Sequence, residues 1–229
     1  MLPGLPFHVL QRGNNRCACF HDDADRAFYL FHLRRLLPAS GCALHAYCLM
    51  TNHVHLLLTP MAEDSCGKFM QRVGQLHSQY MNRRYGRSGT LWQGRFKSCP
   101  IEAESYLVNC HRYVELNPVR ARMVSDPLEY EWSSHRANAG PASDPALTRH
   151  EVILPLGKRD YRELFSVPMR PGAVEEIRKA TNGNYALGSE AFRHRLALAT
   201  GLRTSPGKPG KPARSELLPG QVPLLAEQG

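Results

Sequence analysis

The feature that most constrains the fold is a pair of apolar segments that only two residues separate. CALHAYCLM (42–50) is followed by TN (51–52) and then by HVHLLLT (53–59). Two short strand-like segments joined by so tight a connection predict a β-hairpin. This part of the chain is therefore expected to form antiparallel sheet.

The segments around the hairpin alternate between strand-like and helical patterns. FHVLQR (7–12) reads as a strand, and another strand is expected near 95–101. Apolar residues recur at helical spacing in three further segments, which we expect to be helices at about 22–37, 64–85 and 102–117. The order is β-α-β-β-α-β followed by a helix, which predicts an α+β fold of the ferredoxin-like, split βαβ type. Two helices would cover one face of the sheet, and the third helix would pack near the open face.

The charge of the chain indicates its class of partner. The 229 residues carry a formal net charge of +9, with a pI near 9.4, and clustered Lys and Arg bind polyanions by releasing counterions from phosphates. No apolar stretch reaches the length of a membrane span, and the N-terminus lacks a signal-peptide pattern. We therefore expect no membrane partner and a cytosolic protein.

The second strand of the hairpin carries two histidines one residue apart. Alternation along a strand places His53 and His55 on one face, opposite Leu56 and Leu58, which would anchor the strand to the core. A metal ion held by two histidines alone is weakly fixed, so a metal site here requires a third ligand. Asn117 is a candidate.

Asn117 lies in HRYVELNP (111–118), four residues after Tyr113, so both side chains would project from one side of the third helix. A phenol is a poor nucleophile at neutral pH until a base or a nearby cation favours its phenolate. A divalent ion can also polarise a phosphate oxygen. Together they suit transesterification of a phosphodiester through a phosphotyrosine.

Each of these residues also has an ordinary structural explanation. The histidines could be unliganded, Tyr113 could be a packed aromatic, and Asn117 could cap a helix. Tyr106, on the same helix, is an equally good nucleophile by local pattern. A zinc site involving His45 and Cys48 is a minor alternative, because residues three apart on a strand face opposite ways unless a bulge intervenes.

Groups that could contact DNA gather in three places: after the first strand, around a glycine-rich loop and beside Tyr113. Cations with an interleaved aromatic suit a single strand, where phosphates are neutralised and bases stack. Any of these charges could equally be a solvated surface group, and Trp92 could belong to the core. The candidates are Arg12, Asn14, Asn15, Arg16, Arg83, Arg84, Arg87, Trp92, Gln93, Arg95, Lys97, Arg112, Arg120 and Arg122.

Four blocks of the sequence resemble one known family. HVLQRGNNR, HAYCLMTNHVHLLLTP, GTLWQGRFKS and YLVNCHRYVELNPVRARMV closely resemble the REP-associated tyrosine transposases, a branch of the single-tyrosine HUH transposases with an IS200-like transposase domain. The resemblance covers roughly residues 6–135. It implies that His53 and His55 bind Mg²⁺ or Mn²⁺, that Asn117 completes the site, and that Tyr113 rather than Tyr106 is the nucleophile.

The resemblance also implies a substrate. The family cleaves and rejoins single-stranded DNA beside hairpins of repetitive extragenic palindromes, leaving a 5′-phosphotyrosine and a 3′-hydroxyl. It implies a bacterial, nucleoid-associated enzyme that acts as a monomer or a homodimer. The alternative is a hairpin-binding protein whose catalytic site is idle. A small-molecule metallohydrolase would require further ligands, and no second HxH or HxxxD block follows residue 59.

The remaining sequence suggests three parts. Residues 1–135 would form the transposase domain. Residues 136–202 would form a helical extension, with helices near 160–166, 172–181 and 188–200. Residues 203–229 are rich in Pro and Gly, carry several basic residues and have the composition of a flexible tail.

Overall fold

The sheet of the computed structural model, which describes residues 1–207, has four antiparallel strands in the order β2-β3-β1-β4. The strands are β1 (Phe7–Arg12), β2 (Cys42–Met50), β3 (His53–Pro60) and β4 (Lys97–Pro100). The connection between β2 and β3 is the predicted two-residue hairpin, with Met50 paired to His53. With the two crossover helices, this order confirms the predicted ferredoxin-like arrangement.

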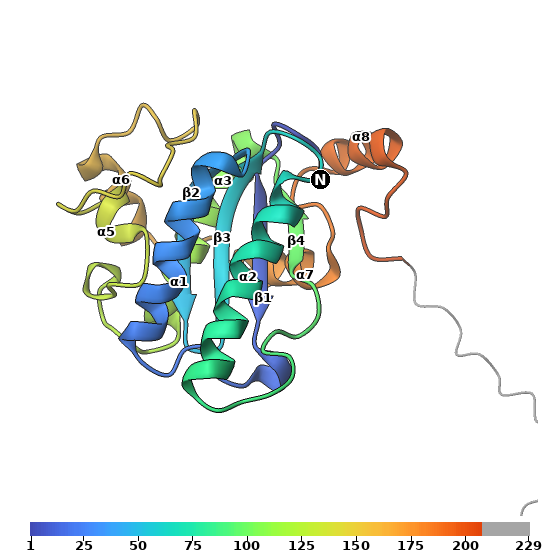
Figure 1. Ribbon diagram of the computed structural model, residues 1–229. Coiled ribbons are helices and arrows are strands. Elements are labelled where there is room, and N and C mark those ends of the chain that lie inside the picture. The colour runs from blue at the N-terminus through green and yellow to red at the C-terminus, as the bar shows by residue number, and fades with distance from the viewer. Residues whose placement is uncertain (208–229) are drawn as a thin grey trace, which may run out of the picture.

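The two crossover helices cover one face of the sheet, where they lie side by side in Figure 1. They are α1 (Asp23–Leu36) and α2 (Ser65–Arg84). Asp22 caps α1 by accepting from the backbone N–H of Asp25 at 3.1 Å. Between helices and sheet lies a core that includes Val9, Leu56 and Leu58. The second strand of the hairpin is therefore anchored by its leucines, as its alternation predicts.

The opposite face carries α3 (Ala103–Glu115), which lies behind the sheet in Figure 1. It shares a second core with α7 (Ala173–Gly183), in which Leu57 of the sheet meets Leu107 and Ile177. Packing of α3 on this face agrees with the prediction. The packing of α7 on this face is not predicted from the sequence, because no local pattern assigns a helix beyond residue 135 to either face of the sheet.

The third helix ends earlier than predicted. It stops at Glu115, and Leu116, with φ −82° and ψ 1°, separates it from the single turn α4 (Asn117–Arg120). Pro118 stands in the first turn of α4, where its missing N–H needs no partner. Asn117 therefore begins a new turn.

The extension is helical where the sequence predicts helices. Its elements are α5 (His135–Asn138), α6 (Lys158–Ser166), α7 and α8 (Glu190–Thr200). Elsewhere in the chain, short 3-10 turns are η1 (Asn14–Arg16), η2 (Leu37–Ala39) and η3 (Pro127–Glu129).

Most of the tail predicted for 203–229 lies outside the described residues. Within residues 1–207, no helix combines the length and apolarity that crossing a bilayer demands.

Three buried histidines make stability depend on pH. Burial lowers the pKa of His45, His77 and His111 to about 4. The unfolded chain takes up these protons near pH 6.5, whereas the folded chain stays neutral until about pH 4, so acidification favours unfolding. We expect the free energy of unfolding to fall as the pH drops from 6.5 towards 4, each histidine contributing up to roughly 1.4 kcal/mol per pH unit. Denaturant titrations across this range measure the slope.

A variant assigns the effect to one of these groups. His77→Phe removes one titrating imidazole from a cluster of aromatic rings, so it should reduce the slope by about one proton. A slope that is the same in this variant and in the wild-type chain would contradict the assignment.

Candidate active site

The two histidines of the hairpin lie beside each other at the start of its second strand, β3. His53 is the first residue of β3 and is half-buried, whereas His55 is only 2% exposed. Their ring centroids are 4.8 Å apart, with the rings almost perpendicular. Both side chains face the same side of the sheet as α3, as strand alternation requires.

Asn52 determines which nitrogen of His53 carries the proton. The Asn52 side-chain amide donates to the carbonyl of Arg16 at 2.9 Å, which leaves its oxygen to face His53 Nδ1 at 2.6 Å. An amide oxygen only accepts, so Nδ1 is the donor. The lone pair of His53 is therefore on Nε2.

His55 contacts a third histidine that the sequence analysis did not single out. His8 lies on β1, diagonally across from His55 on the neighbouring strand, and is completely buried. Its Nε2 is 2.7 Å from His55 Nδ1, and its Nδ1 is 2.7 Å from the hydroxyl of Thr181 in α7. A line of polar contacts thus runs from α7 along the face of the sheet that carries α3 to His55.

All three imidazoles are held neutral. Burial lowers the pKa of His53 to about 4, with a further contribution from the positive charge of Arg12. Burial lowers the pKa of His8 to about 3 and that of His55 well below its ordinary value. A neutral imidazole keeps one lone pair in the plane of its ring, which is the form that coordinates a metal ion.

Asn117 contacts the other ring nitrogen of His53. Its amide nitrogen is 3.5 Å from His53 Nε2. Because amide oxygen and nitrogen differ only by a rotation of the group, the oxygen can occupy the same place. Although Asn117 belongs to α4 rather than to the helix of Tyr113, its amide still reaches His53.

Tyr113 packs edge-on against the histidines. Its ring centroid lies 5.6 Å from that of His55 and 5.4 Å from that of His8. Its hydroxyl forms no hydrogen bond with another residue of the described part. Tyr106 lies instead in a surface hollow with Asn109 and Glu176, and no contact joins it to the histidines. Of the two candidate nucleophiles, only Tyr113 is brought to this site.

The donor set fits a divalent ion. His53 has its lone pair on Nε2, and His55 can adopt the same tautomer. These two imidazoles and the Asn117 amide would leave the other ligand positions of an ion to water or substrate oxygens. In residues 1–207, no three His, Cys, Asp or Glu side chains gather into a metal site, so the zinc alternative at His45 and Cys48 gains no support. His45 is instead bonded to Thr59 and to the carbonyl of Thr148.

Arg120 places a positive charge at Tyr113. Its guanidinium carbon lies 4.5 Å from the centre of the Tyr113 ring, and one of its nitrogens donates to the Tyr113 carbonyl. Its Nε and Nη1 are buried with no partner among the described residues. Burial lowers the pKa of Arg120 to about 10, so it is still a cation at neutral pH.

Two of the predicted DNA-contacting groups lie side by side. The turn at 12–16 and the loop at 91–95 are joined by backbone hydrogen bonds from Asn14 to Leu91 and from Gln93 to Arg12, both 2.8 Å long. The exposed side chains on this surface are those of Asn15, Arg16, Gln93 and Arg95. We call these four residues the polar rim.

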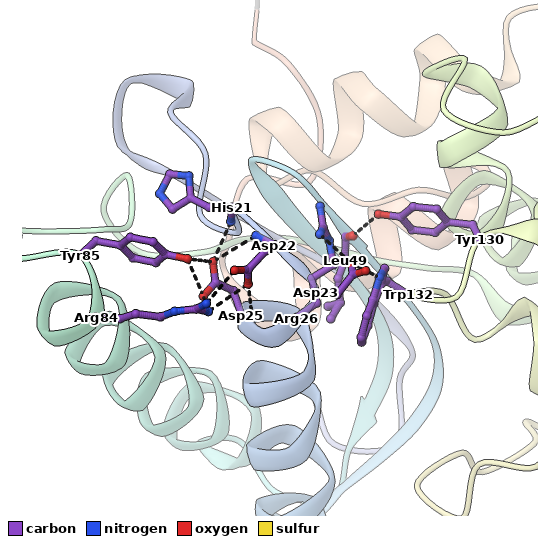
Figure 2. A network of polar contacts seen from close by, with 10 residues as sticks. All are labelled: His21, Asp22, Asp23, Asp25, Arg26, Leu49, Arg84, Tyr85, Tyr130 and Trp132. Carbon is purple, nitrogen blue, oxygen red and sulfur yellow. Dashed lines mark hydrogen bonds and ion pairs between the residues drawn. The ribbon is translucent and has the colours of Figure 1, made fainter.

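Three other predicted DNA contacts are used within the fold. Trp92 is 7% exposed, and its indole N–H donates to Gly74. Arg112 is 8% exposed and donates to the carbonyl of Val167. Figure 2 shows Arg84 paired with Asp22 and Asp25, at 2.6 and 2.5 Å.

Arg12 and Asn14, in the turn at 12–16, are half-buried, and two further predicted contacts lie outside the polar rim. Arg83 is exposed at the end of α2, whereas the ammonium group of Lys97 donates to the carbonyl of Asn182 at 2.8 Å. Contact of these residues with DNA stays a prediction.

Little in the sequence indicates the residues that support the histidines. Asn52 directly precedes the pair, but its local pattern predicts only a turn. His8 lies in an ordinary strand pattern, and Thr181 lies in a helix more than 120 residues away from the hairpin. The predicted fold places β1 beside β3, but the sequence does not show the strand register that sets His8 diagonally across from His55.

Comparison with known proteins places these residues in context. Residues 2–117, just over half of the chain, match the family described as IS200-like transposases. No curated protein sequence matches the chain.

Several solved structures match the chain. A REP-associated tyrosine transposase bound to a REP hairpin superposes with a TM-score of 0.53 at 15% identity, covering 66% of this chain and 88% of that one. A weaker match is a proposed transposase from Deinococcus radiodurans R1, with a TM-score of 0.37, 17% identity, and coverage of 54% and 88%. At these identities, the likeness concerns the fold.

Proposed function

Because the chain belongs to the IS200-like transposase family, we propose that it cleaves and rejoins single-stranded DNA beside short palindromic hairpins, with Tyr113 as nucleophile. The observation that carries the proposal is the placement of Tyr113 edge-on to His55, with Asn117 reaching His53 from the same side. Tyr113, the two histidines and Asn117 come from separate elements of the chain, and their proximity supports the proposal.

His53 and His55 would hold a divalent ion through Nε2, with the Asn117 amide oxygen as third ligand. Mg²⁺ and Mn²⁺ are the proposed ions. Bound there, the ion would polarise a phosphate oxygen and orient the scissile bond. The chain's own contribution is to keep both imidazoles neutral and fixed, because burial and the contacts with Asn52 and His8 leave each ring a single orientation.

The proposed chemical step is a transesterification. Tyr113 Oη attacks the phosphorus and loses its proton, the new Oη–P bond forms, and the bond from phosphorus to O3′ breaks. The departing O3′ takes up a proton and becomes a 3′-hydroxyl, while the 5′-phosphate stays on the tyrosine. Rejoining is the reverse reaction with a 3′-hydroxyl as the attacking group, so no external energy source is needed.

Arg120 is the cation best placed to accompany this step. Its guanidinium lies over the Tyr113 ring and has two nitrogens without a partner among the described residues. A guanidinium pairs readily with phosphate oxygens. We expect it to stabilise the charge that accumulates on the phosphate as the new bond forms.

The proposed substrate follows from the relative and from charge. The structurally similar REP-associated transposase is bound to a REP hairpin, and this chain carries a net charge of +9. The polar rim offers two exposed arginines and two amides close to the histidine end of β3. These groups suit backbone contacts with a hairpin stem and its flanking single strand.

Incubation of the wild-type chain with an end-labelled single-stranded hairpin tests the proposal. We expect a protein–DNA adduct that survives denaturing electrophoresis in Mn²⁺ or Mg²⁺, because the phosphotyrosine bond is covalent. Chelation of the metal should abolish the adduct and leave hairpin binding detectable by gel shift. Hairpin binding without an adduct in either metal would instead indicate an idle catalytic site.

A further inference from the structure

Thr181 lies outside the part of the chain that matches the IS200-like family, yet it connects to the candidate metal site. It belongs to α7, whose buried positions Ala173, Ile177, Ala180 and Thr181 recur at helical spacing and pack against the sheet. Thr181 is 1% exposed and directs its hydroxyl at the buried ring of His8.

The direction of the hydrogen bonds follows from the acceptor at the end of this line. Thr181 Oγ1 is 2.8 Å from the carbonyl oxygen of Ile177. A carbonyl oxygen only accepts, so the single hydroxyl proton of Thr181 lies on this contact. The hydroxyl must then accept from its other partner, which makes His8 Nδ1 the donor at 2.7 Å.

The same reasoning passes through His8 to His55. A neutral imidazole has one N–H, so His8 Nε2 is left with a lone pair and accepts from His55 Nδ1 at 2.7 Å. The two rings are nearly coplanar, at 13°, with centroids 4.9 Å apart. The centroid separation exceeds the N···N distance by about two ring radii, as expected when the nitrogens face each other edge to edge.

We propose that Thr181 and His8 are positioning residues that fix the tautomer of His55, so that its Nε2 lone pair is directed at the metal ion. This inference rests on the proposed function, in which His55 is a metal ligand. Groups that bind the far nitrogen of a metal-binding histidine set its orientation and basicity. The helical extension would therefore contribute to the chemistry of the transposase domain.

Metal binding in the absence of DNA provides one test. We expect Thr181→Val, which keeps the shape but removes the hydroxyl, to weaken Mn²⁺ binding by roughly 10-fold or more, because loss of such a contact typically costs that much. Free Mn²⁺ can be followed by electron paramagnetic resonance. Thr181→Ser retains the hydroxyl and should restore the wild-type affinity.

Thr59→Val is the matched control. Thr59 is also a buried threonine bonded to a histidine, since its hydroxyl is 2.8 Å from His45 Nε2, but it is not connected to the metal site. Its replacement should cost stability to a similar degree and leave Mn²⁺ affinity unchanged. Equal Mn²⁺ affinity in Thr181→Val and the wild-type chain would overturn the inference.

The tautomer itself can be read without any metal or variant. Long-range ¹⁵N–¹H correlation of the metal-free wild-type chain should show the proton of His55 on Nδ1, and a proton on Nε2 overturns the inference even if Thr181→Val does not fold. A wild-type chain with the expected tautomer that binds no Mn²⁺ contradicts the proposed function instead. The two failures are thus distinguishable.

Discussion

Replacement of Tyr113 by Phe should abolish the covalent adduct with hairpin DNA while leaving the fold and hairpin binding intact. The change removes only the hydroxyl, which forms no hydrogen bond within the described residues, and it preserves the ring that packs against His8 and His55. Loss of a nucleophile removes the whole covalent route, so we expect adduct formation to fall by roughly a thousand-fold or more. Quantification of the adduct over time on labelled hairpin measures the effect.

Tyr106→Phe is the control for this prediction. Tyr106 lies on the same helix and also loses only a hydroxyl, but it faces a hollow away from the histidines. The Tyr106→Phe variant should form the covalent adduct at the wild-type rate. An adduct that persists in Tyr113→Phe and disappears in Tyr106→Phe would overturn the assignment of the nucleophile.

The sheet and its first two helices could be predicted because the signals there are local. The hairpin follows from two apolar segments two residues apart, and the Leu56 and Leu58 positions follow from strand alternation. The predicted end of α3, at 117, lies two residues beyond the observed end at Glu115. A proline at 118 is compatible both with a helix that stops at 117 and with a new turn that begins there.

The candidate site could be predicted only in part. His53 and His55 carry their own sequence pattern, whereas only the resemblance to the family favours Tyr113 over Tyr106. The fold brings His53, His55 and Tyr113 together. Arg112 shows the limit of such reasoning, because a basic residue beside the proposed nucleophile suggests a phosphate contact, whereas here it is buried and donates to the carbonyl of Val167. Its surroundings are built by a segment 55 residues further along the chain, and no local pattern indicates that contact.

The largest effect on stability is expected at Glu115, the last residue of α3. This carboxylate is completely buried and accepts hydrogen bonds from Ser134 at 2.6 Å, Asn138 at 2.7 Å, His135 at 2.8 Å and Tyr161 at 3.0 Å. Burial acts to raise the pKa of Glu115, but the hydrogen bonds and the neighbouring histidines prevail and lower it. The carboxylate is thus ionised and ties α5 and α6 to the helix of Tyr113.

Glu115→Ala removes the buried charged acceptor that these four donors share. Removing one partner of a buried charged network costs about 3–5 kcal/mol, so we expect the free energy of unfolding to fall by that amount in denaturant titrations. Glu163→Ala, which removes an exposed carboxylate paired with Arg159 on α6, should cost no more than about 0.5 kcal/mol. Equal losses in the two variants would mean that the extension is held to α3 by apolar packing alone. Because Glu115 lies two residues from both Tyr113 and Asn117, any partly folded Glu115→Ala chain should also lose adduct formation.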